Sequence, residues 1–288
     1  MGIIVGEDTR ILVQGITGHQ GSFNALQMLK FGSKVVAGTS PGKGGTEVGG
    51  IKVYNSVEEA MKEGPNATFI SVAAPYVLDA AKEALYNDID LIYILTEKVP
   101  FHDTMKIVNL ARSMGKLVLG PNGPGATTPF SCKLGIMPNQ IFRKGGIGVI
   151  SRSGTLTYEI VNLITESGLG ESTVVGLGGD PVTGMNFIDA LEMFKDDEDT
   201  EAVVMVGEIG GTAEEEAAEY IKNKFNKPVV AYITGRSAPP GKRMGHAGAI
   251  ITRGRGTAES KVKALEEAGV RVGSYPHEVP KLLKEVLG

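Results

Sequence analysis

The sequence predicts an α/β protein with two parallel sheets, one in each half of the chain. Short, continuous apolar runs alternate with segments whose apolar residues recur at the helical period. These runs lack the polar alternation of a half-exposed strand, so helices should cover both faces of each sheet. The alternation stops only once, in a stretch rich in Pro and Gly between residues 121 and 146. That interruption divides the chain into two domains.

The first half should contain strands joined by helices. The strands are expected at residues 11–15, 34–39, 67–74, 90–97 and 116–122. The helices are expected at residues 22–32, 56–64, 75–87 and 102–115. Ser56, with Glu59 three positions later, has the spacing of a capping box, and Pro75 suits the start of a helix.

The second half repeats this pattern. We interpret residues 123–145 as a loop-like connection, so the predicted domains span residues 1–122 and 146–288. Strands, with the turns that follow them, are expected at residues 147–154, 172–179, 201–211, 227–239 and 270–275. Helices are expected at residues 155–168, 185–197, 212–225, 259–269 and 277–288.

Composition excludes several classes of protein. The net charge of -4 and the pI of about 5.7 argue against a protein that binds nucleic acid or an anionic membrane. A single cysteine, Cys132, allows no intrachain disulfide and suggests a reducing, cytoplasmic compartment. The N-terminal residues carry early charges and do not resemble a signal peptide. No apolar run approaches the ~20 residues of a membrane span.

The loop after the first strand has glycines at positions 15, 18 and 21 and precedes a helix. Glycines let the backbone approach a phosphate, and the start of a helix presents free N–H groups to it. The first spacing departs by one residue from the dinucleotide fingerprint G-x-G-x-x-G. A tight strand-to-helix turn without a ligand remains an alternative reading.

The end of the second strand carries no acidic residue for a ribose hydroxyl, which an NAD site would require. It is followed by a glycine-rich loop with Lys43, which suits a phosphate unless the side chain is merely solvated. NADP and coenzyme A both fit this pattern. Thr96, Glu97 and Lys98 follow a later strand, at the edge where open α/β sheets bind ligands.

Three loops of the second half should meet at the carboxyl edge of its sheet. The sequence SRSGT at residues 151–155 opens a helix and suits an anion, or it is an ordinary N-cap. Glu208 lies among glycines at the end of a strand, where it is either a functional carboxylate or an ordinary turn residue. His246 lies in KRMGHAGAI, between small residues that leave its ring little to pack against.

His246 has no His, Cys or carboxylate neighbours at ligand spacing, so we expect no metal site. The serine loop lacks the first glycine of a G-x-S-x-G nucleophile elbow. The remaining roles for the imidazole are general base and nucleophile. Beside an anion-binding helix start, a nucleophilic histidine points to phosphoryl transfer, with Glu208 able to bind one ring nitrogen and leave the other to attack.

These motifs resemble one family, the alpha subunits of succinate–CoA ligase (succinyl-CoA synthetase). The resemblance covers nearly the whole chain and rests on VQGITGHQGSF, AGTSPGKGGTE, ILTE, LGIMP, GVISRSGTLTYE, GLGGDPVTG, GEIGG and GRSAPPGKRMGHAGAI. It implies an N-terminal Rossmann-like, CoA-binding domain followed by a flavodoxin-like parallel α/β domain. Gly123 departs from the family, which commonly has cysteine there.

The resemblance also implies roles for individual residues. In the first half, the residues that would contact coenzyme A are Thr17, Gly18, His19, Gln20, Lys43, Thr96, Glu97 and Lys98. His19 falls where the family varies, so its contact would come from the backbone. In the second half, Tyr158 would lie near the carboxylate substrate, His246 would be phosphorylated and Glu208 would orient it. The phosphate-holding helix start would be Ser153, Gly154 and Thr155.

The implied reaction converts succinate, CoA and a nucleoside triphosphate reversibly to succinyl-CoA, nucleoside diphosphate and phosphate, as in the tricarboxylic acid cycle. It would pass through phosphohistidine and succinyl phosphate, which divides one difficult step into easier ones. The chain has no G-x-x-x-x-G-K-[ST] motif. The resemblance places ATP or GTP and Mg2+ on a beta subunit with an ATP-grasp fold, in an αβ or α2β2 assembly.

Three alternatives stay open at this point. A related acyl-CoA ligase would act on another acid, such as malate, because part of the acid pocket would come from the partner. An NADP-dependent oxidoreductase is disfavoured by the context of His246 and by the lack of a residue pair suited to hydride transfer. A non-catalytic regulator that binds CoA would never carry phosphate on His246.

Overall fold

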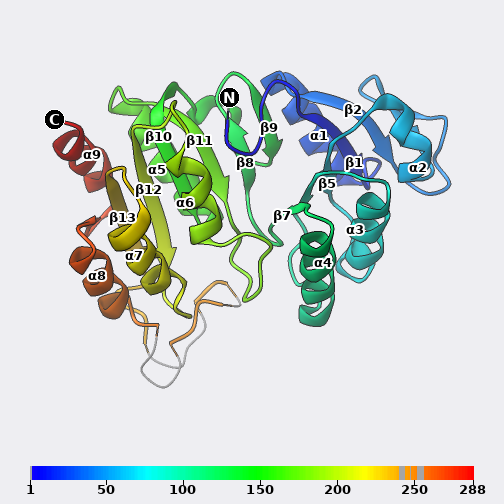
Figure 1. The fold of residues 1–288 in the computed structure, drawn as a ribbon. Coiled ribbons are helices and arrows are strands. Elements are labelled where there is room, and N and C mark those ends of the chain that lie inside the picture. The colour runs from blue at the N-terminus through cyan, green and yellow to red at the C-terminus, as the bar shows by residue number, and fades with distance from the viewer. Residues whose placement is uncertain (1, 240–243, 247, 252–255) are drawn as a thin grey trace. The chain divides into compact units, whose positions relative to one another are not determined.

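The structure of the chain, a computed structural model, describes residues 2–239, 244–246, 248–251 and 256–288 (Figure 1). It forms two compact units. The N-terminal unit contains Val5–Asn139 with Val182–Gly184. The C-terminal unit contains Gln140–Pro181 and Met185–Gly288, with the chain before Val5. The domain boundaries at residues 122 and 146 stay a prediction.

The sheet of the N-terminal unit has the strand order β3-β4-β2-β1-β5-β6-β7. Only the β3–β4 pair is antiparallel in this sheet of described residues. The strands are β1 (Arg10–Gln14), β2 (Lys34–Thr39), β3 (Glu47–Val48), β4 (Ile51–Tyr54), β5 (Ala67–Ile70), β6 (Leu91–Ile94) and β7 (Leu117–Leu119). From β4 onward this is the doubly wound order of a Rossmann-like sheet, which reverses between β1 and β5. The predicted fold class of this half is confirmed.

The helices that cover this sheet fall into two groups: the later ones, which contact one another in sequence order, and the first, which packs elsewhere. They are α1 (His19–Phe31), α2 (Val57–Ala60), α3 (Val77–Tyr86) and α4 (Phe101–Ser113), with short 3-10 turns at Met61–Glu63 and Ala74–Tyr76. The helix α3 packs beside α4 and also contacts α2, whereas α1 packs against the strand β9 (Cys132–Gly135) (Figure 1). Between the helices lie continuous apolar strands, and the Phe69 and Tyr93 rings meet edge to face at 5.2 Å.

The interpretation of residues 123–145 as a loop was wrong in part, because this stretch contains an antiparallel hairpin. Its strands are β8 (Gly125–Thr128) and β9 (Cys132–Gly135). Its glycines lie where the two strands approach closely: a Cβ on Gly125 would lie 2.2 Å from the carbonyl oxygen of Leu134. The glycines that suggested a loop therefore permit strand pairing here. Ser33 Oγ also donates to the Lys133 carbonyl at 2.9 Å, which ties the hairpin to the α1–β2 turn.

The C-terminal unit has a parallel sheet with the strand order β14-β13-β12-β10-β11. Its strands are β10 (Lys144–Ser151), β11 (Glu171–Gly176), β12 (Ala202–Glu208), β13 (Val229–Thr234) and β14 (Arg271–Gly273). Taken in chain order, this is the 2-1-3-4-5 arrangement of flavodoxin-like sheets. The prediction for this half is therefore also confirmed.

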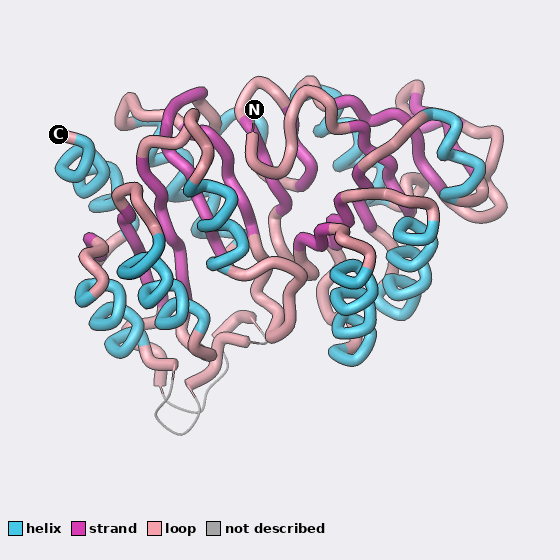
Figure 2. The backbone as a smooth tube through the Cα atoms, in the orientation of Figure 1, coloured by secondary structure: helices cyan, strands magenta, loops and turns pink. Residues whose placement is uncertain are grey.

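The sheet of the C-terminal unit lies between two layers of helices (Figure 2). The helices are α5 (Gly154–Glu166), α6 (Phe187–Lys195), α7 (Ala213–Lys224), α8 (Ala258–Glu267) and α9 (Val279–Leu287), with 3-10 turns at Asn139–Ile141 and Pro276–Glu278. The helix α7 packs between α6 and α8, and α5 packs against α9. Within the described ranges, no helix combines the length and apolar character needed to cross a membrane.

A buried carboxylate in this unit should make its stability depend on pH. Glu171, at the start of β11, is fully buried and accepts hydrogen bonds from Arg143 N and Thr165 Oγ1 at 3.1 and 3.2 Å. Burial raises the pKa of Glu171 from 4.5 to about 7. A raised carboxyl pKa in the folded state means that stability is lost as pH rises from about 4.5 to about 7.

We expect Glu171→Gln to remove this loss, which amounts to about 3 kcal/mol at most. The check is denaturant unfolding of both proteins at pH 5 and pH 7.5, with the exposed Glu266→Gln as the control. An equal pH dependence in wild type and Glu171→Gln would contradict the assignment.

Candidate active site

His246 and Glu208 form the centre of the candidate active site in the C-terminal unit. Glu208 is the last residue of β12, and its carboxylate is almost completely buried. Its Oε2 lies 2.7 Å from Nδ1 of His246, whose side chain remains 25% exposed. A buried carboxylate thus contacts one nitrogen of an imidazole that is still partly exposed to solvent. The two residues that the sequence singled out separately are therefore in direct contact.

This hydrogen bond determines the chemistry of the ring. The hydrogen bond to Glu208 raises the pKa of His246 above its ordinary value, and it outweighs burial, which acts in the opposite direction. With Nδ1 occupied as a donor to the carboxylate, the neutral ring carries its lone pair on Nε2. That nitrogen can act as a nucleophile, while Glu208 stabilises the positive charge that develops on the ring.

Glycines make room for the imidazole. A Cβ on Gly179, in the loop after β11, would lie 2.3 Å from Cγ and Nδ1 of His246. The amide of Gly248 donates to the Gly179 carbonyl at 3.4 Å, which joins this loop to the segment that carries His246, the histidine loop. A Cβ on Gly210 would in turn lie 2.0 Å from the Gly248 carbonyl oxygen. The chain around His246 is therefore packed against the backbone that follows β11 and β12, the two strands on either side of β10.

The predicted anion site lies at the start of α5, directly after β10. Ser153 is the N-cap residue, and its Oγ accepts from Leu156 N at 3.3 Å. The ordinary capping role is therefore real, but it satisfies only one of the free N–H groups at the helix start. Gly154 is half-buried and Thr155 is exposed, so both lie at a surface that a phosphate can reach. Tyr158 lies one turn further along, and burial raises the pKa of its hydroxyl.

A buried ion network behind Glu208 was not predicted from the sequence. Arg152, the residue after β10, lies 3.4 Å from Glu208 and 3.0 Å from Glu214. Glu214 also pairs with Lys261 of α8, and both side chains are fully buried. Only the sequence SRSGT drew attention to Arg152, as part of the predicted anion loop. Glu214 and Lys261 resemble ordinary helix-surface residues, because no local pattern reveals a contact between two different helices.

In the N-terminal unit, the first glycine loop is built as a turn for close approach. Gly15 has a φ of +84°, and a Cβ there would lie 2.6 Å from the Ser71 carbonyl oxygen. Gly21 lies inside α1, where a Cβ would lie 2.1 Å from the Gly15 carbonyl oxygen. Gly18 is the N-cap residue of α1 in an extended conformation. The three glycines thus bring the helix start against the end of β1.

The predicted CoA residues of this loop are exposed at that helix start. Thr17, Gly18, His19 and Gln20 are all exposed, and none of these side chains fills the core. Thr17 Oγ1 donates to Ser40 Oγ at 2.9 Å. Ser40 opens the second glycine-rich loop, in which Lys43 is exposed. The Thr17–Ser40 hydrogen bond therefore brings both predicted phosphate loops together.

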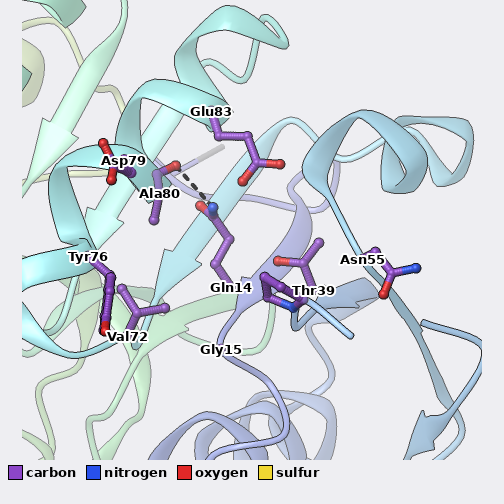
Figure 3. Close-up of a pocket in the computed structure, with 10 residues that line it drawn as sticks. Gln14, Gly15, Thr39, Asn55, Val72, Tyr76, Asp79, Ala80 and Glu83 are labelled. Carbon is purple, nitrogen blue, oxygen red and sulfur yellow. Dashed lines mark hydrogen bonds between the residues drawn. The ribbon is translucent and has the colours of Figure 1, made fainter. Parts of the chain in front are cut away.

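A cavity of about 560 Å³ opens beside these loops (Figure 3). Gln14 and Gly15 at the end of β1, Thr39 at the end of β2, and Val72 after β5 contribute to its lining. Gln14 points toward α3 and donates from Nε2 to the Ala80 carbonyl at 3.0 Å. The full lining is Gln14, Gly15, Thr39, Pro41, Asn55, Val72, Tyr76, Asp79, Ala80 and Glu83. The cavity thus lies at the switch point between β1 and β5, where doubly wound sheets bind ligands.

None of the eight predicted CoA residues is among those lining residues, although residues close to them in sequence, such as Gly15 and Pro41, are. Thr96 comes closest through a hydrogen bond, because its Oγ1 donates to the carbonyl of the lining residue Val72 at 2.7 Å. Glu97 and Lys98 are exposed and form an ion pair at 3.4 Å. The lining was missed because its polar members, such as Asn55 and Glu83, come from segments without a recognisable motif. In the part of the chain that is described, no cluster of three or more His, Cys, Asp or Glu could hold a metal ion.

Two family models match the chain in the same order as the two units. A CoA binding domain matches residues 6–98, and a CoA-ligase model matches residues 150–271. The first contains the glycine loop and the cavity. The second contains Glu208, His246 and the ion network.

Solved structures share the fold of the whole chain. An ATP citrate lyase of Methanosaeta concilii, in complex with (3S)-citryl-CoA, matches with a TM-score of 0.90 and 25% identity. The match covers 98% of this chain and 50% of that one, so this chain spans about half the length of the lyase. A dinucleotide-forming acetyl-coenzyme A synthetase of Ca. Korarchaeum cryptofilum matches with a TM-score of 0.77 at 19% identity, over 97% of this chain and 61% of that one, and shows the fold alone.

Full-length relatives are much more similar. The alpha subunit of ADP-forming succinate–CoA ligase from Methanothermobacter thermautotrophicus is 57% identical, over 99% of this chain and 97% of the relative. The alpha subunit 2 from Archaeoglobus fulgidus is 55% identical over the full length of both chains. The alpha subunit from Staphylococcus aureus is 51% identical, over 99% of this chain and 95% of the relative. The chain therefore belongs to the family of succinate–CoA ligase alpha subunits.

Proposed function

We propose that this chain, together with a beta subunit, converts succinate, CoA and a nucleoside triphosphate reversibly to succinyl-CoA, nucleoside diphosphate and phosphate. The observation that carries the proposal is the 2.7 Å contact between His246 Nδ1 and the buried Glu208 carboxylate. This contact prepares Nε2 as a nucleophile at the carboxyl edge of a parallel sheet. The names of the relatives, which are ADP-forming enzymes, make ATP the first nucleotide to test.

In the proposed mechanism, His246 carries the phosphoryl group. Nε2 attacks the γ-phosphorus, the bond to the nucleoside diphosphate breaks, and Glu208 stabilises the charged ring through Nδ1. A succinate carboxylate oxygen then attacks phosphorus, which frees the histidine and forms succinyl phosphate. The CoA thiol, on losing its proton, attacks the acyl carbon, and phosphate leaves. Each step exchanges one bond for another, as covalent catalysis requires.

The start of α5 would hold the phosphoryl group during these steps. We assign this role to the backbone amides and hydroxyls of Ser153, Gly154 and Thr155, because a helix start favours an anion. Tyr158 would contact the carboxylate substrate. Burial raises the pKa of Tyr158, so its hydroxyl stays protonated and can donate to an anion. These residues do not distinguish succinate from malate, which remains the alternative acid.

Coenzyme A would occupy the N-terminal unit. The cavity of about 560 Å³ is large enough for a nucleotide base, and Gly15 opens its edge to the backbone of the glycine loop. Phosphates would lie outside it, against the start of α1 and Lys43. The proposed contacts are Thr17, Gly18, His19, Gln20, Lys43, Thr96, Glu97 and Lys98. In this arrangement the ribose of CoA is not bound by an acidic residue at the end of β2, where the sequence has none.

The nucleotide and Mg2+ would bind to the partner. The naming of the relatives as alpha subunits supports a beta subunit, and we propose that it has an ATP-grasp fold. The assembly would be αβ or α2β2 and cytoplasmic. This chain would then supply the phosphohistidine and the CoA site of a shared enzyme.

Phosphorylation of the chain tests the proposal directly. The tagged chain is purified with its beta subunit, incubated with Mg2+ and γ-labelled ATP or GTP, and examined for acid-labile, base-stable label. We expect label on wild type and none on His246→Asn. Succinate with CoA should discharge it, whereas discharge by malate instead would name the alternative acid. Absence of label in the intact complex would contradict the mechanism and favour the CoA-binding regulator.

A further inference from the structure

The ion network behind the active site converges on Glu214, in the first turn of α7. Glu214 is fully buried, and its carboxylate accepts from three elements of the C-terminal unit. Arg152 Nη1 donates at 3.0 Å from the β10–α5 loop, and the Glu208 amide donates at 3.1 Å from the end of β12. Lys261 of α8, which follows the histidine loop, donates to the other oxygen. Glu214 thus joins the segments that flank the active site.

The chain makes room for this side chain immediately beside the active-site carboxylate. A Cβ on Gly207 would lie 2.7 Å from Cγ of Glu214. Gly207 is buried in β12 and directly precedes Glu208. Any larger residue there would displace the Glu214 carboxylate from its three donors. This close fit indicates a defined position for Glu214.

Glu208 shares one cation with Glu214. Oε1 of Glu208 is buried and has no hydrogen-bond partner among the described residues. The nearest cationic group in the network is Arg152 Nη2 at 3.4 Å, an ion-pair distance without a hydrogen bond. The same guanidinium donates to Glu214 through Nη1. One guanidinium therefore lies between two buried carboxylates, and it is hydrogen-bonded to Glu214 but not to Glu208.

The position of the Arg152 guanidinium between these two carboxylates affects His246. A carboxylate that accepts a charged hydrogen bond from arginine has part of its charge neutralised locally. With Arg152 bound to Glu214, no hydrogen bond from a described residue reaches Glu208 Oε1, and the charge of Glu208 is available to Nδ1 of His246. We propose that Glu214, anchored by Lys261, is a positioning residue that holds Arg152 away from Glu208 so that Glu208 can act on His246.

Among the residues that the structure describes, three charged groups face the imidazole. They are Glu208 from β12, Arg152 from the β10–α5 loop and Asp180 from the loop after β11. Both carboxylates favour the protonated ring, and Arg152 disfavours it. If Glu214 loses its charge, the Arg152 guanidinium, whose Nη2 already lies 3.4 Å from Glu208 Oε1, can turn to donate to that oxygen. His246 should then release its proton at lower pH.

The test is a histidine titration of the full chain, labelled with 13C at Cε1 of its histidines. The sequence has four histidines, so His246→Asn identifies the signal of His246. We expect Glu214→Gln to lower the titration midpoint of His246 by about one pH unit, the lower end of what one nearby charge produces. The signals of His19, His102 and His277 should keep their wild-type midpoints. Thermal unfolding followed by circular dichroism reports whether the variant is folded.

Glu215→Gln is the matched control. Glu215 is the next residue on α7 and accepts from the same Lys261, at 2.9 Å, but its other oxygen accepts from Ser260. The variant removes an equal charge without releasing Arg152, so the His246 midpoint should stay at the wild-type value. Arg152→Met alone should raise the midpoint, because Arg152 disfavours the protonated ring. Adding Glu214→Gln to Arg152→Met should then leave the midpoint where Arg152→Met alone puts it, because the effect of Glu214 passes through Arg152.

An unchanged midpoint in folded Glu214→Gln, or an equal decrease in Glu215→Gln, would overturn the inference. If Glu214→Gln does not fold, Glu214→Asp tests it instead: the shorter side chain keeps the charge but withdraws from Arg152 Nη1, so the midpoint should still fall, and an unchanged midpoint would overturn the inference. The importance of this positioning for catalysis rests on the proposed function. The titration itself needs neither nucleotide nor partner, so its result is independent of whether label appears on His246.

Discussion

Glu208→Gln should reduce the rate of His246 phosphorylation about 100-fold or more while leaving the chain folded. A glutamine amide can present its NH2 group to Nδ1, which would stabilise the tautomer with the proton on Nε2 and remove the attacking lone pair. It also removes the charge that stabilises the ring as it becomes positive, and general acid–base groups of this kind contribute about 100- to 10,000-fold. The measurement is the initial rate of label incorporation from γ-labelled ATP in the complex with the beta subunit.

The pH profile of that rate adds a second readout. Because the hydrogen bond to Glu208 raises the pKa of His246, the wild-type rate should rise at a pH above the ordinary histidine range. In Glu208→Gln this rise should move to lower pH, although its plateau is much lower. Glu201→Gln is the control, since Glu201 is exposed just before the opposite end of β12. A wild-type rate in Glu208→Gln would contradict the proposed role of the carboxylate.

Much of the fold was predictable because its strands are buried on both faces. Continuous apolar runs such as ILVQ at residues 11–14 and EAVVMVGE at residues 201–208 correspond to β1 and β12. The strand β4 and the β8–β9 hairpin were missed for the opposite reason. In β4 an exposed Lys52 interrupts the apolar run, and in the hairpin glycine and proline surround the strands. Neither stretch resembles a buried strand until its pairing partner is known.

The start of α2, which follows β4, shows a similar limit of prediction from sequence, here for a single hydrogen bond. Ser56 Oγ accepts from Glu59 N at 3.2 Å, as the capping-box spacing predicted. The return bond differs, because Glu59 Oε2 accepts from Asn55 N rather than from Ser56 N. Sequence spacing predicted the cap correctly, but the direction of the incoming chain decided which amide the glutamate reaches.

For the active site, sequence context singled out the residues with unusual surroundings. His246 and Glu208 lie among glycines, where a large polar side chain has no packing role. The sequence marks Arg152 only as part of an anion loop, and it gives no sign of a role for Glu214 or Lys261. The Glu214–Lys261 pair joins residues 47 positions apart, and its meaning depends on how α7 and α8 pack. Such contacts are properties of the tertiary fold and leave no periodic signal in one sequence.

Gly179→Ala should displace the His246 ring from the position in which its Nδ1 contacts Glu208. The added methyl carbon would lie 2.3 Å from Cγ and Nδ1 of the ring, which is well inside van der Waals contact. Gly179 does not have a left-handed φ, so the backbone tolerates alanine and the strain falls on the imidazole. The ring must move by about an ångström, which weakens the 2.7 Å bond to Glu208. A misplacement of that size costs about 100-fold in rate.

We therefore expect about 100-fold slower labelling of His246 in Gly179→Ala, with thermal unfolding close to that of wild type. Gly6→Ala is the matched control, because a methyl group there meets no atom within 4 Å. Wild-type labelling in Gly179→Ala would mean that the reactive position of the ring differs from the one in contact with Gly179.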